Sequence, residues 1–361
     1  MMLFVILRGV VFILIRELIR GKDFWLDASR AIAIALVVFT HSHEQAGIHS
    51  ELLRSIFYSI DRLGVPVFFM ISGGLVLPRA AKSSILSFYR KRIPQFIILI
   101  FLWSVITNTV NTYASGSGFI DSVSSAFINY NGIYPGHFGA AAQLWFMYSI
   151  TQLYLIAPFL GRLLKSLTNK EILIFILICV LLNQIKVTGS FYGGEWGALF
   201  WMGGDFTGSY ISYFMVGYLV LERGILDDVK FNGVIPCLMI TIIPLLILVA
   251  TDIATHKVND VLHWYTGSLF IFISGVGLFV LSKNIFENLN SRFLSIISAC
   301  SFGVYLSHYA FMYAIKWVVN SKGFVLSDIE KVLVYFSLSF ILSLTFTWIV
   351  MRVKYLKYFI S

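Results

Sequence analysis

Charged residues and cysteines are both scarce in this chain of 361 residues. Only 12% of the residues are Asp, Glu, Lys or Arg, whereas a soluble globular domain has about 25%. The three cysteines, Cys179, Cys237 and Cys300, lie singly in apolar segments and form no CxxC pair. The low charge excludes an ordinary soluble domain. The isolated cysteines argue against a disulfide framework, a zinc site or a thiol nucleophile.

Familiar motifs of soluble enzymes are also missing. The sequence contains no Walker loop, HExxH, GxSxG or haem-attachment motif, and it has no internal repeat or low-complexity tract. No small-residue cleavage site follows the N-terminal apolar stretch, so we do not expect a removed signal peptide. We likewise expect no metal site, no permanently bound cofactor and no second, soluble domain.

What the sequence does have is long apolar segments. Its residues are 58% hydrophobic, and the mean hydropathy is +0.84. Most of its apolar segments reach the ~20 residues that a membrane-spanning helix needs, although the fifth and sixth are shorter. We therefore predict an all-α polytopic membrane protein with about ten transmembrane helices. The segments are 25–43, 61–78, 93–113, 143–161, 172–187, 208–222, 234–251, 263–282, 296–318 and 332–351.

The first 23 residues differ in character from the rest of the chain. At helical spacing Arg8, Arg16 and Arg20 fall within a sector of about 120°, which favours an amphipathic helix on the inner membrane surface. A further spanning helix is the alternative. We expect residues 1–23 to be this interfacial segment and residues 24–361 to form the transmembrane domain.

The distribution of positive charge predicts the orientation in the membrane. Nineteen of the 27 Lys and Arg residues fall in the N-terminal stretch, the C-terminal tail and every second connection between segments. The positive-inside rule then places both termini in the cytoplasm. We expect the chain to be a multi-pass protein of the inner (plasma) membrane. The net charge of +9 is thus attributed to cytoplasmic loops beside membrane lipid, and no nucleic acid partner is expected.

The first apolar segment contains an arginine and ends in a histidine. Arg30 and His41 are eleven residues apart, which places them on one helix face and ~16 Å apart along the axis. His43 falls on the opposite face. An arginine in hydrocarbon costs at least ~2.5 kcal/mol, so it calls for a partner, a cavity or a function. The alternative is that Arg30 extends to a nearby interface and His41 only marks the helix end.

The second segment and the loop after it contain two further candidate features. Small residues at Ser72 and Gly73 would let another backbone or a thin ligand approach, and helix packing is the alternative explanation. Arg90, Lys91 and Arg92 directly precede the third segment and would suit a polyanion such as the phosphates of a nucleotide cofactor. An anchor against anionic lipid explains these cations equally well.

Aromatic residues, glycines and two acids gather in the segments predicted to lie outside. Trp145, Glu195, Trp196 and Asp205 could stack on a sugar and hydrogen-bond its hydroxyls, whereas an aromatic interfacial belt explains the aromatics alone. In the ninth segment Tyr305 and His308 follow Ser301, and His308 shares a helix face with that serine. His308 is a candidate for substrate contact or for a structural hydrogen bond between helices.

Taken together, these stretches resemble the acyltransferase-3 family of membrane O-acyltransferases. The closest likeness is to the surface-polysaccharide branch that includes the O-acetyltransferase of enterobacterial common antigen. The matching residues are Leu26-Asp27-Ala28-Ser29-Arg30 with His41, Val65 to Gly73, Leu144-Trp145-Phe146 with Tyr154 and Pro158, Gly204-Asp205, and Gly303-Val304-Tyr305 with His308. Two positions depart from the family pattern: Gln143 replaces a frequent His, and Tyr89 stands where the first of two paired arginines would fall.

The resemblance implies acetyl-CoA or another acyl-CoA as a cytoplasmic donor and a glycan hydroxyl as acceptor. On this basis the CoA phosphates would lie on Arg90, Lys91 and Arg92, with Arg30 lining the inner passage. The pantetheine arm would pass Ser72 and Gly73 to reach the far end of the first helix.

At that end His41 would act as general base on the acceptor, or it would carry the acyl group itself. The acceptor would be contacted by Trp145, Glu195, Trp196, Asp205, Tyr305 and His308. The competing interpretation is a glycan or small-solute transporter or flippase, because proton-coupled carriers also use intramembrane Arg and His.

Overall fold

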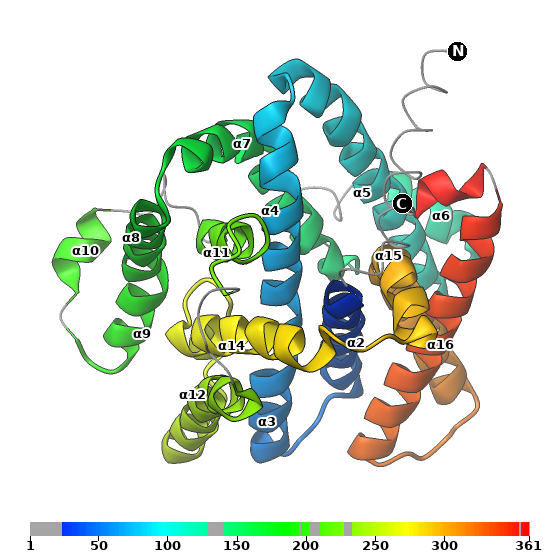
Figure 1. Cartoon of the computed structure of the whole chain (residues 1–361). Coiled ribbons are helices and arrows are strands. Elements are labelled where there is room, and N and C mark those ends of the chain that lie inside the picture. Colours follow the sequence, from blue (N-terminus) through cyan, green and yellow to red (C-terminus); the bar gives the residue numbers. More distant parts are fainter. Residues whose placement is uncertain are drawn as a thin grey trace.

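The structure is a computed structural model that describes residues 24–128, 140–194, 196–202, 210–226, 233–353 and 355–360. These residues form helices and connections and contain no strand, which confirms the all-α prediction (Figure 1). The predicted N-terminal amphipathic helix at 1–23 lies outside the described residues.

The order of the helices follows the order of the apolar segments. Several helices begin at a Ser or Thr that accepts a backbone hydrogen bond, and Thr168 and Ser327 each form a complete capping box. The longer elements are α2 (Phe24–Ala46), α3 (Glu51–Asp61), α4 (Gly64–Lys82), α5 (Ile85–Ala114), α6 (Phe119–Ile128), α7 (Trp145–Ser166), α8 (Asn169–Val180), α11 (Ile211–Leu221), α12 (Val234–Thr255), α14 (Leu269–Phe286), α15 (Arg292–Ser321) and α16 (Asp328–Arg352). The shorter ones are η1 (Ala142–Leu144), η2 (Leu181–Ile185), α9 (Lys186–Phe191), α10 (Gly197–Trp201), α13 (Asp260–His263) and η3 (Leu356–Phe359).

Nine helical stretches of the described residues are long and apolar enough to cross a membrane. They match nine of the ten predicted segments, with α8, η2 and α9 together forming one of them. The predicted segment 208–222 is the exception, because its helix α11 has only 11 residues. A helix of that length rises ~16 Å, about half of the hydrocarbon thickness, so α11 does not span by itself.

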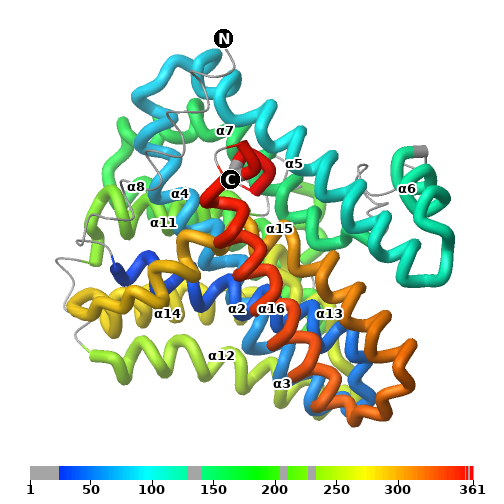
Figure 2. Tube along the Cα trace, turned by 90° about the vertical axis from the view of Figure 1, so that its right-hand side faces the viewer, coloured from blue at the N-terminus to red at the C-terminus, as the bar shows by residue number. Residues whose placement is uncertain are grey.

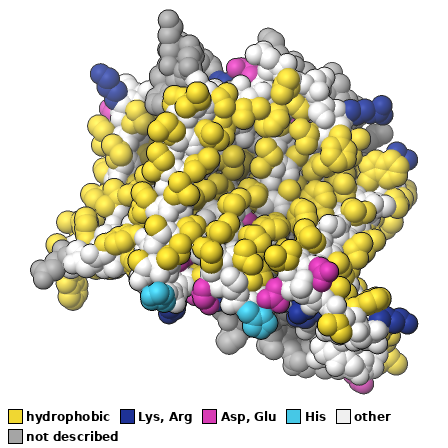
Figure 3. Space-filling view, turned by 90° about the horizontal axis from the view of Figure 1, so that it is seen from below, with side chains coloured by type: hydrophobic (Ala, Val, Ile, Leu, Met, Phe, Trp, Pro, Cys, Tyr) yellow, Lys and Arg dark blue, Asp and Glu magenta, His cyan; other side chains and the backbone are white. Residues whose placement is uncertain are grey.

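The outer surface is apolar, as expected for a protein in lipid. Only 28% of the most apolar window of α12, and the same share for α16, is buried inside the protein. Figure 3 shows a broad hydrophobic band across one face, with acidic and histidine side chains along its lower margin. The chain is a multi-pass membrane protein by the length, composition and surface of these helices.

Helix α2 occupies the middle of the bundle and positions the candidate site. It packs against α4, α14, α15 and α16, and the two views agree on its central place (Figures 1 and 2). Its residues Ala28, Ala33 and Ile34 are fully buried. This burial explains why a helix with an arginine and two histidines is stable in this position: its polar residues face other helices, where partners are available.

Close packing of α4 on α11 depends on glycine. A Cβ on Gly73 would overlap the backbone carbonyl of Phe214, and a Cβ on Gly217 would overlap that of Met70. Helix packing therefore accounts for the glycine at position 73, which is one of the two interpretations that the sequence left open. Its neighbour Ser72 is only partly buried.

Candidate active site

The last turns of α2 place His41 against a carboxylate. His41 is 9% exposed, and its Nδ1 lies 2.8 Å from Oε2 of Glu44. Residues three apart on a helix lie on neighbouring positions of one face, so this contact follows from the sequence spacing.

Glu44 in turn is held by the corner between α3 and α4. Arg62 donates from Nη2 to Oε1 of Glu44 at 2.9 Å, and the Tyr58 hydroxyl donates to the same oxygen at 3.3 Å. Glu44 accepts from an arginine and is therefore an ionised acceptor, and the proton of His41 is assigned to Nδ1 on this hydrogen bonding. The Nε2 atom of His41 then keeps its lone pair.

Arg62 itself is buried among aromatic rings. It is 8% exposed and donates from Nη1 to the Tyr265 hydroxyl at 3.2 Å. Its guanidinium carbon lies 4.6 Å from the centre of the Tyr58 ring and 5.4 Å from that of Trp264. A buried charge needs this many partners to be stable, so Arg62 is fixed in position and fixes Glu44.

Helix α15 brings a second imidazole to His41. The rings of His41 and His308 are stacked with their centroids 5.4 Å apart, and the Tyr309 hydroxyl lies 3.1 Å from Nδ1 of His41. His308 is fully buried, with Nδ1 3.0 Å from the Val304 carbonyl oxygen. Its Nδ1 therefore carries a proton, and its Nε2 has no partner among the described residues.

His43 pairs with a different carboxylate from His41, although its ring packs on Tyr58 with centroids 4.6 Å apart. Its Nε2 lies 2.5 Å from Oδ2 of Asp61, and both side chains are buried. The pair ties α2 to α3, which is a structural role.

Positive charges gather near the other end of α2. Arg30 lies 3.7 Å from Asp27, and the hydroxyl of Tyr154 on α7 is within electrostatic range of Arg30, Arg79 and Arg92. The three arginines come from α2, α4 and α5, so the fold brings together positive charges that are far apart in the sequence.

Two of the three cations predicted for donor phosphates join this group. Lys91 is within electrostatic range of Arg92 and Arg79. The third, Arg90, is exposed. We call Arg30, Arg79, Lys91 and Arg92 the basic cluster.

The residues predicted to contact the acceptor are only partly brought together. Trp145 stacks on Tyr265 with ring centroids 5.5 Å apart, beside Arg62. The Tyr305 hydroxyl donates to the Gln143 carbonyl at 2.6 Å, so this hydroxyl already has a partner inside the protein.

Of three other predicted acceptor positions, the structure describes only Trp196. The Trp196 ring packs on Gly189 and Gly194, in the connection before α10 and away from α2 (Figure 1). Glu195 and Asp205 lie outside the described residues.

Glu44, Arg62 and Tyr309 are the site residues that the sequence analysis missed. Glu44 had a usable signal, because an acid one turn after a histidine at a helix end is within reach of it. Arg62 and Tyr309 had none, since their contacts with α2 depend on the tertiary fold. Among the described residues no group of three or more His, Cys, Asp or Glu is arranged to bind a metal ion.

Comparison with known proteins identifies the family of this chain. Neither the curated proteins nor the solved structures include a match. A family model described as an acyltransferase domain matches residues 23–352, which include α2 and every residue that surrounds His41. The chain therefore belongs to the acyltransferase-3 family of membrane acyltransferases.

Proposed function

We propose that this protein transfers an acetyl or other short acyl group from cytoplasmic acyl-CoA to a hydroxyl of a cell-surface glycan or of its lipid-linked precursor. It would act in the inner membrane with both termini in the cytoplasm. The observation that supports this proposal best is the chain of contacts from Arg62 through Glu44 to His41. The acyltransferase family favours this function over the transport alternative.

The proposed chemistry is general-base catalysis at Nε2 of His41. The acceptor hydroxyl oxygen attacks the thioester carbonyl carbon while Nε2 takes the hydroxyl proton. The carbon–sulfur bond then breaks, and the CoA thiolate leaves and takes the proton from the imidazolium. Glu44 holds the ring with Nε2 free and stabilises the positive charge that forms on it.

In this proposal the donor binds near the Arg30 end of α2, and catalysis takes place at the His41 end. The basic cluster offers four cations to the phosphates of CoA, and Arg30 is ~16 Å from His41 along the helix axis. The donor would extend along α2, past Ser72, so that its thioester reaches His41. His308 is stacked on His41, and its Nε2 has no partner among the described residues; in this proposal it would contact the acceptor or the acyl group.

The direct test uses purified protein and acetyl-CoA labelled in the acetyl group, with glycan-containing membranes as acceptor. We expect His41→Gln to reduce acetyl transfer and CoA release by ~10²–10⁴-fold. His49→Gln is the matched control, because His49 has 88% of its side chain exposed and pairs with Asp328. Normal acetyl transfer by His41→Gln would show that His41 is not the general base. Absence of CoA release by the unchanged protein would show that acetyl-CoA is not the donor.

A further inference from the structure

The last turns of α2 are joined to α15 by polar contacts that the proposed mechanism does not use. His41 and Gln45 are four residues apart on α2, and Tyr309 and Lys316 are seven apart on α15, so each pair lies on one helix face. Nζ of Lys316 donates to Oε1 of Gln45 at 3.0 Å, and the Gln45 side chain also hydrogen-bonds the Tyr309 hydroxyl. These four residues form a continuous chain of contacts from Lys316 to His41.

The Tyr309 hydroxyl can hydrogen-bond His41 in two ways, and only one of them suits a general base. The hydroxyl oxygen lies 3.1 Å from Nδ1 of His41, the same nitrogen that lies 2.8 Å from Glu44. Because Nδ1 carries a proton when it faces the ionised Glu44, the tyrosine oxygen can only accept there. If Tyr309 donated its own proton to Nδ1 instead, the imidazole proton would move to Nε2 and the proposed base would be lost.

The proton of Tyr309 therefore needs a different acceptor, and Gln45 offers one. Tyr309 is buried, with 4% exposed, and a buried hydroxyl proton without a partner is costly. On Gln45 only Oε1 accepts, because the amide nitrogen is a donor. Lys316 has donors only, so its contact assigns Oε1 to the side that faces α15. A carbonyl oxygen has two lone pairs and can accept from Lys316 and Tyr309 together.

We propose that Gln45 is a positioning residue for acyl transfer: with Lys316 it accepts the Tyr309 proton and so keeps that proton away from His41. This proposal rests on the proposed function. Glu44 and Gln45 then act on His41 from adjacent positions of one helix. Glu44 accepts the proton of Nδ1, and Gln45 engages the donor that would compete for Nδ1. As a result, Nε2 keeps its lone pair.

The first test compares steady-state CoA release by purified full-length variants. Gln45→Met keeps the length of the side chain but removes its oxygen, so the Tyr309 proton is left with Nδ1 of His41 as an acceptor. We expect the turnover number to fall about tenfold, the effect of one redirected buried hydrogen bond, while the KM for acyl-CoA changes little. Tyr309→Phe alone should cost less than about threefold, because Glu44 still accepts from Nδ1.

The double variant of Gln45→Met with Tyr309→Phe distinguishes positioning from a structural role. Without the Tyr309 hydroxyl there is no competing proton, so turnover should return to the Tyr309→Phe value, whereas independent structural effects would add. Additive losses, or a normal turnover number in Gln45→Met, would overturn the proposal. Tyr313→Phe is the matched control and should leave turnover unchanged, because the Tyr313 hydroxyl, also on α15, donates to the Ala140 carbonyl at 2.8 Å.

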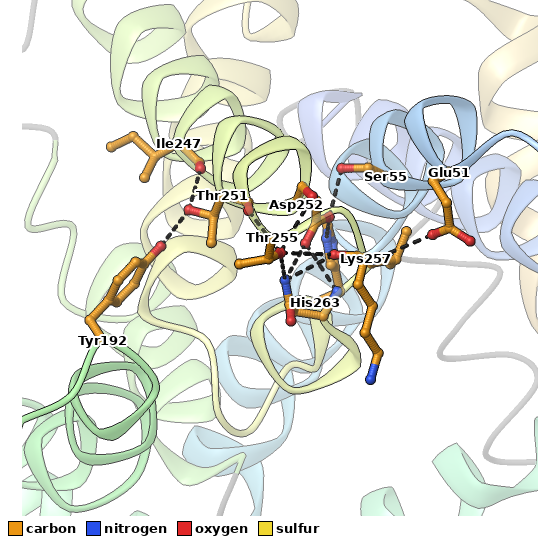
Figure 4. Close-up of polar contacts among 11 residues, drawn as sticks. Glu51, Ser55, Tyr192, Ile247, Thr251, Asp252, Thr255, Lys257 and His263 are labelled. Atoms are coloured by element: carbon orange, nitrogen blue, oxygen red, sulfur yellow. Dashed lines mark hydrogen bonds and ion pairs between the residues drawn. The ribbon is translucent and has the colours of Figure 1, made fainter.

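A measurement without acyl-CoA separates this proposal from the proposed function. Nitrogen NMR of the protein in lipid, with isotope-labelled histidine, distinguishes an imidazole proton on Nδ1 from one on Nε2. His41→Gln identifies the signals of His41. His263 is the reference for the opposite tautomer in the same sample, because Asp252 accepts from Nε2 of His263 at 2.7 Å and from the Ser55 hydroxyl at 2.7 Å (Figure 4).

We expect the His41 proton on Nδ1 in the unchanged protein and partly on Nε2 in Gln45→Met. A proton that stays on Nδ1 in Gln45→Met would overturn the role of Gln45, even where acetyl transfer is observed. The expected move of the proton, without any acetyl transfer by the unchanged protein, would refute the proposed function alone.

Discussion

At the scale of single residues, Glu44 connects His41, the proposed catalytic base, to Arg62 and Tyr58. Glu44→Gln would keep the shape but remove the charge that faces both His41 and Arg62. The glutamine amide can donate to Nδ1 of His41 and so favour the wrong tautomer, with the proton on Nε2. We expect the turnover number to fall by ~10²–10⁴-fold, while the KM for acyl-CoA changes little. The measurement is steady-state CoA release at varied acyl-CoA.

The control for that variant is Glu287→Gln, since Glu287 is exposed just after α14 and is not in contact with the site. A variant with Glu44→Gln and an unchanged turnover number would show that His41 needs no oriented tautomer.

Replacement of His43 is expected to lower the stability of the fold rather than to act on catalysis directly. The structure buries His43 against Asp61. His43→Ala would leave the Asp61 carboxylate buried without this partner, and breaking such a pair costs about 3–5 kcal/mol. We expect a lower thermal midpoint in detergent, measured by intrinsic fluorescence, and poor membrane yield. A midpoint equal to that of the unchanged protein would mean that water replaces the histidine.

The residue scale also shows what the sequence could predict of the site. Arg30 and His41 were identifiable because charge in an apolar run is costly, and helical spacing puts them on one face. Arg62, which holds Glu44, and Tyr309, which contacts His41, were not identifiable, because 18 residues separate Arg62 from Glu44 and 268 separate Tyr309 from His41 along the chain. The pairing of His43 with Asp61 was hidden for the same reason.

At the scale of elements, the contact between α4 and α11 tests whether glycine is required there. Gly217→Ala adds a Cβ where the Met70 carbonyl stands, so the two helices must separate. Overpacking of this kind costs about 1–3 kcal/mol. We expect a lower thermal midpoint for Gly217→Ala, whereas Gly197→Ala should be neutral, because nothing lies within 4 Å of a Cβ at Gly197. Equal midpoints would mean that the helices shift at no cost.

The convergence of α2, α4 and α5 predicts how the donor is bound. If the basic cluster holds the CoA phosphates, Arg92→Gln and Arg79→Gln should each raise the apparent KM for acyl-CoA about tenfold. The turnover number at saturation should remain near that of the unchanged protein. Arg292→Gln is the control, an exposed arginine at the start of α15. An unchanged KM in both cluster variants would place the phosphate site elsewhere.

The elements themselves were largely predictable, because long apolar segments in a chain with so little charge can only be spans. The predicted spans were wrong where an apolar segment does not form one long helix. In segment 208–222 the described residues form the short helix α11, which packs on α4. Helix α14 begins at Leu269 rather than at 263, because α13 and a turn occupy 260–268. A hydrophobicity pattern does not distinguish burial in protein from burial in lipid.

At the scale of the whole molecule, the orientation in the membrane is open to a direct test. The positive-inside rule predicts that the connection after α5 faces outward, and Ser117 is exposed there. The three native cysteines are buried, which keeps the background low. Ser117→Cys should react with an impermeant thiol reagent in intact cells. Labelling that requires permeabilised cells would invert the orientation and would place His41 on the donor side.

The separation of Arg30 from His41 along α2 has a consequence for substrate choice. If CoA is anchored at the basic cluster, its thioester lies at the same position along the α2 axis whatever acyl group it carries, because the acyl chain extends beyond that point. Selection of the carrier and selection of the acyl group would thus occur at opposite ends of one helix. Residues around His41, such as His308 and Tyr309, could then be changed to admit longer acyl groups while recognition of CoA stays intact.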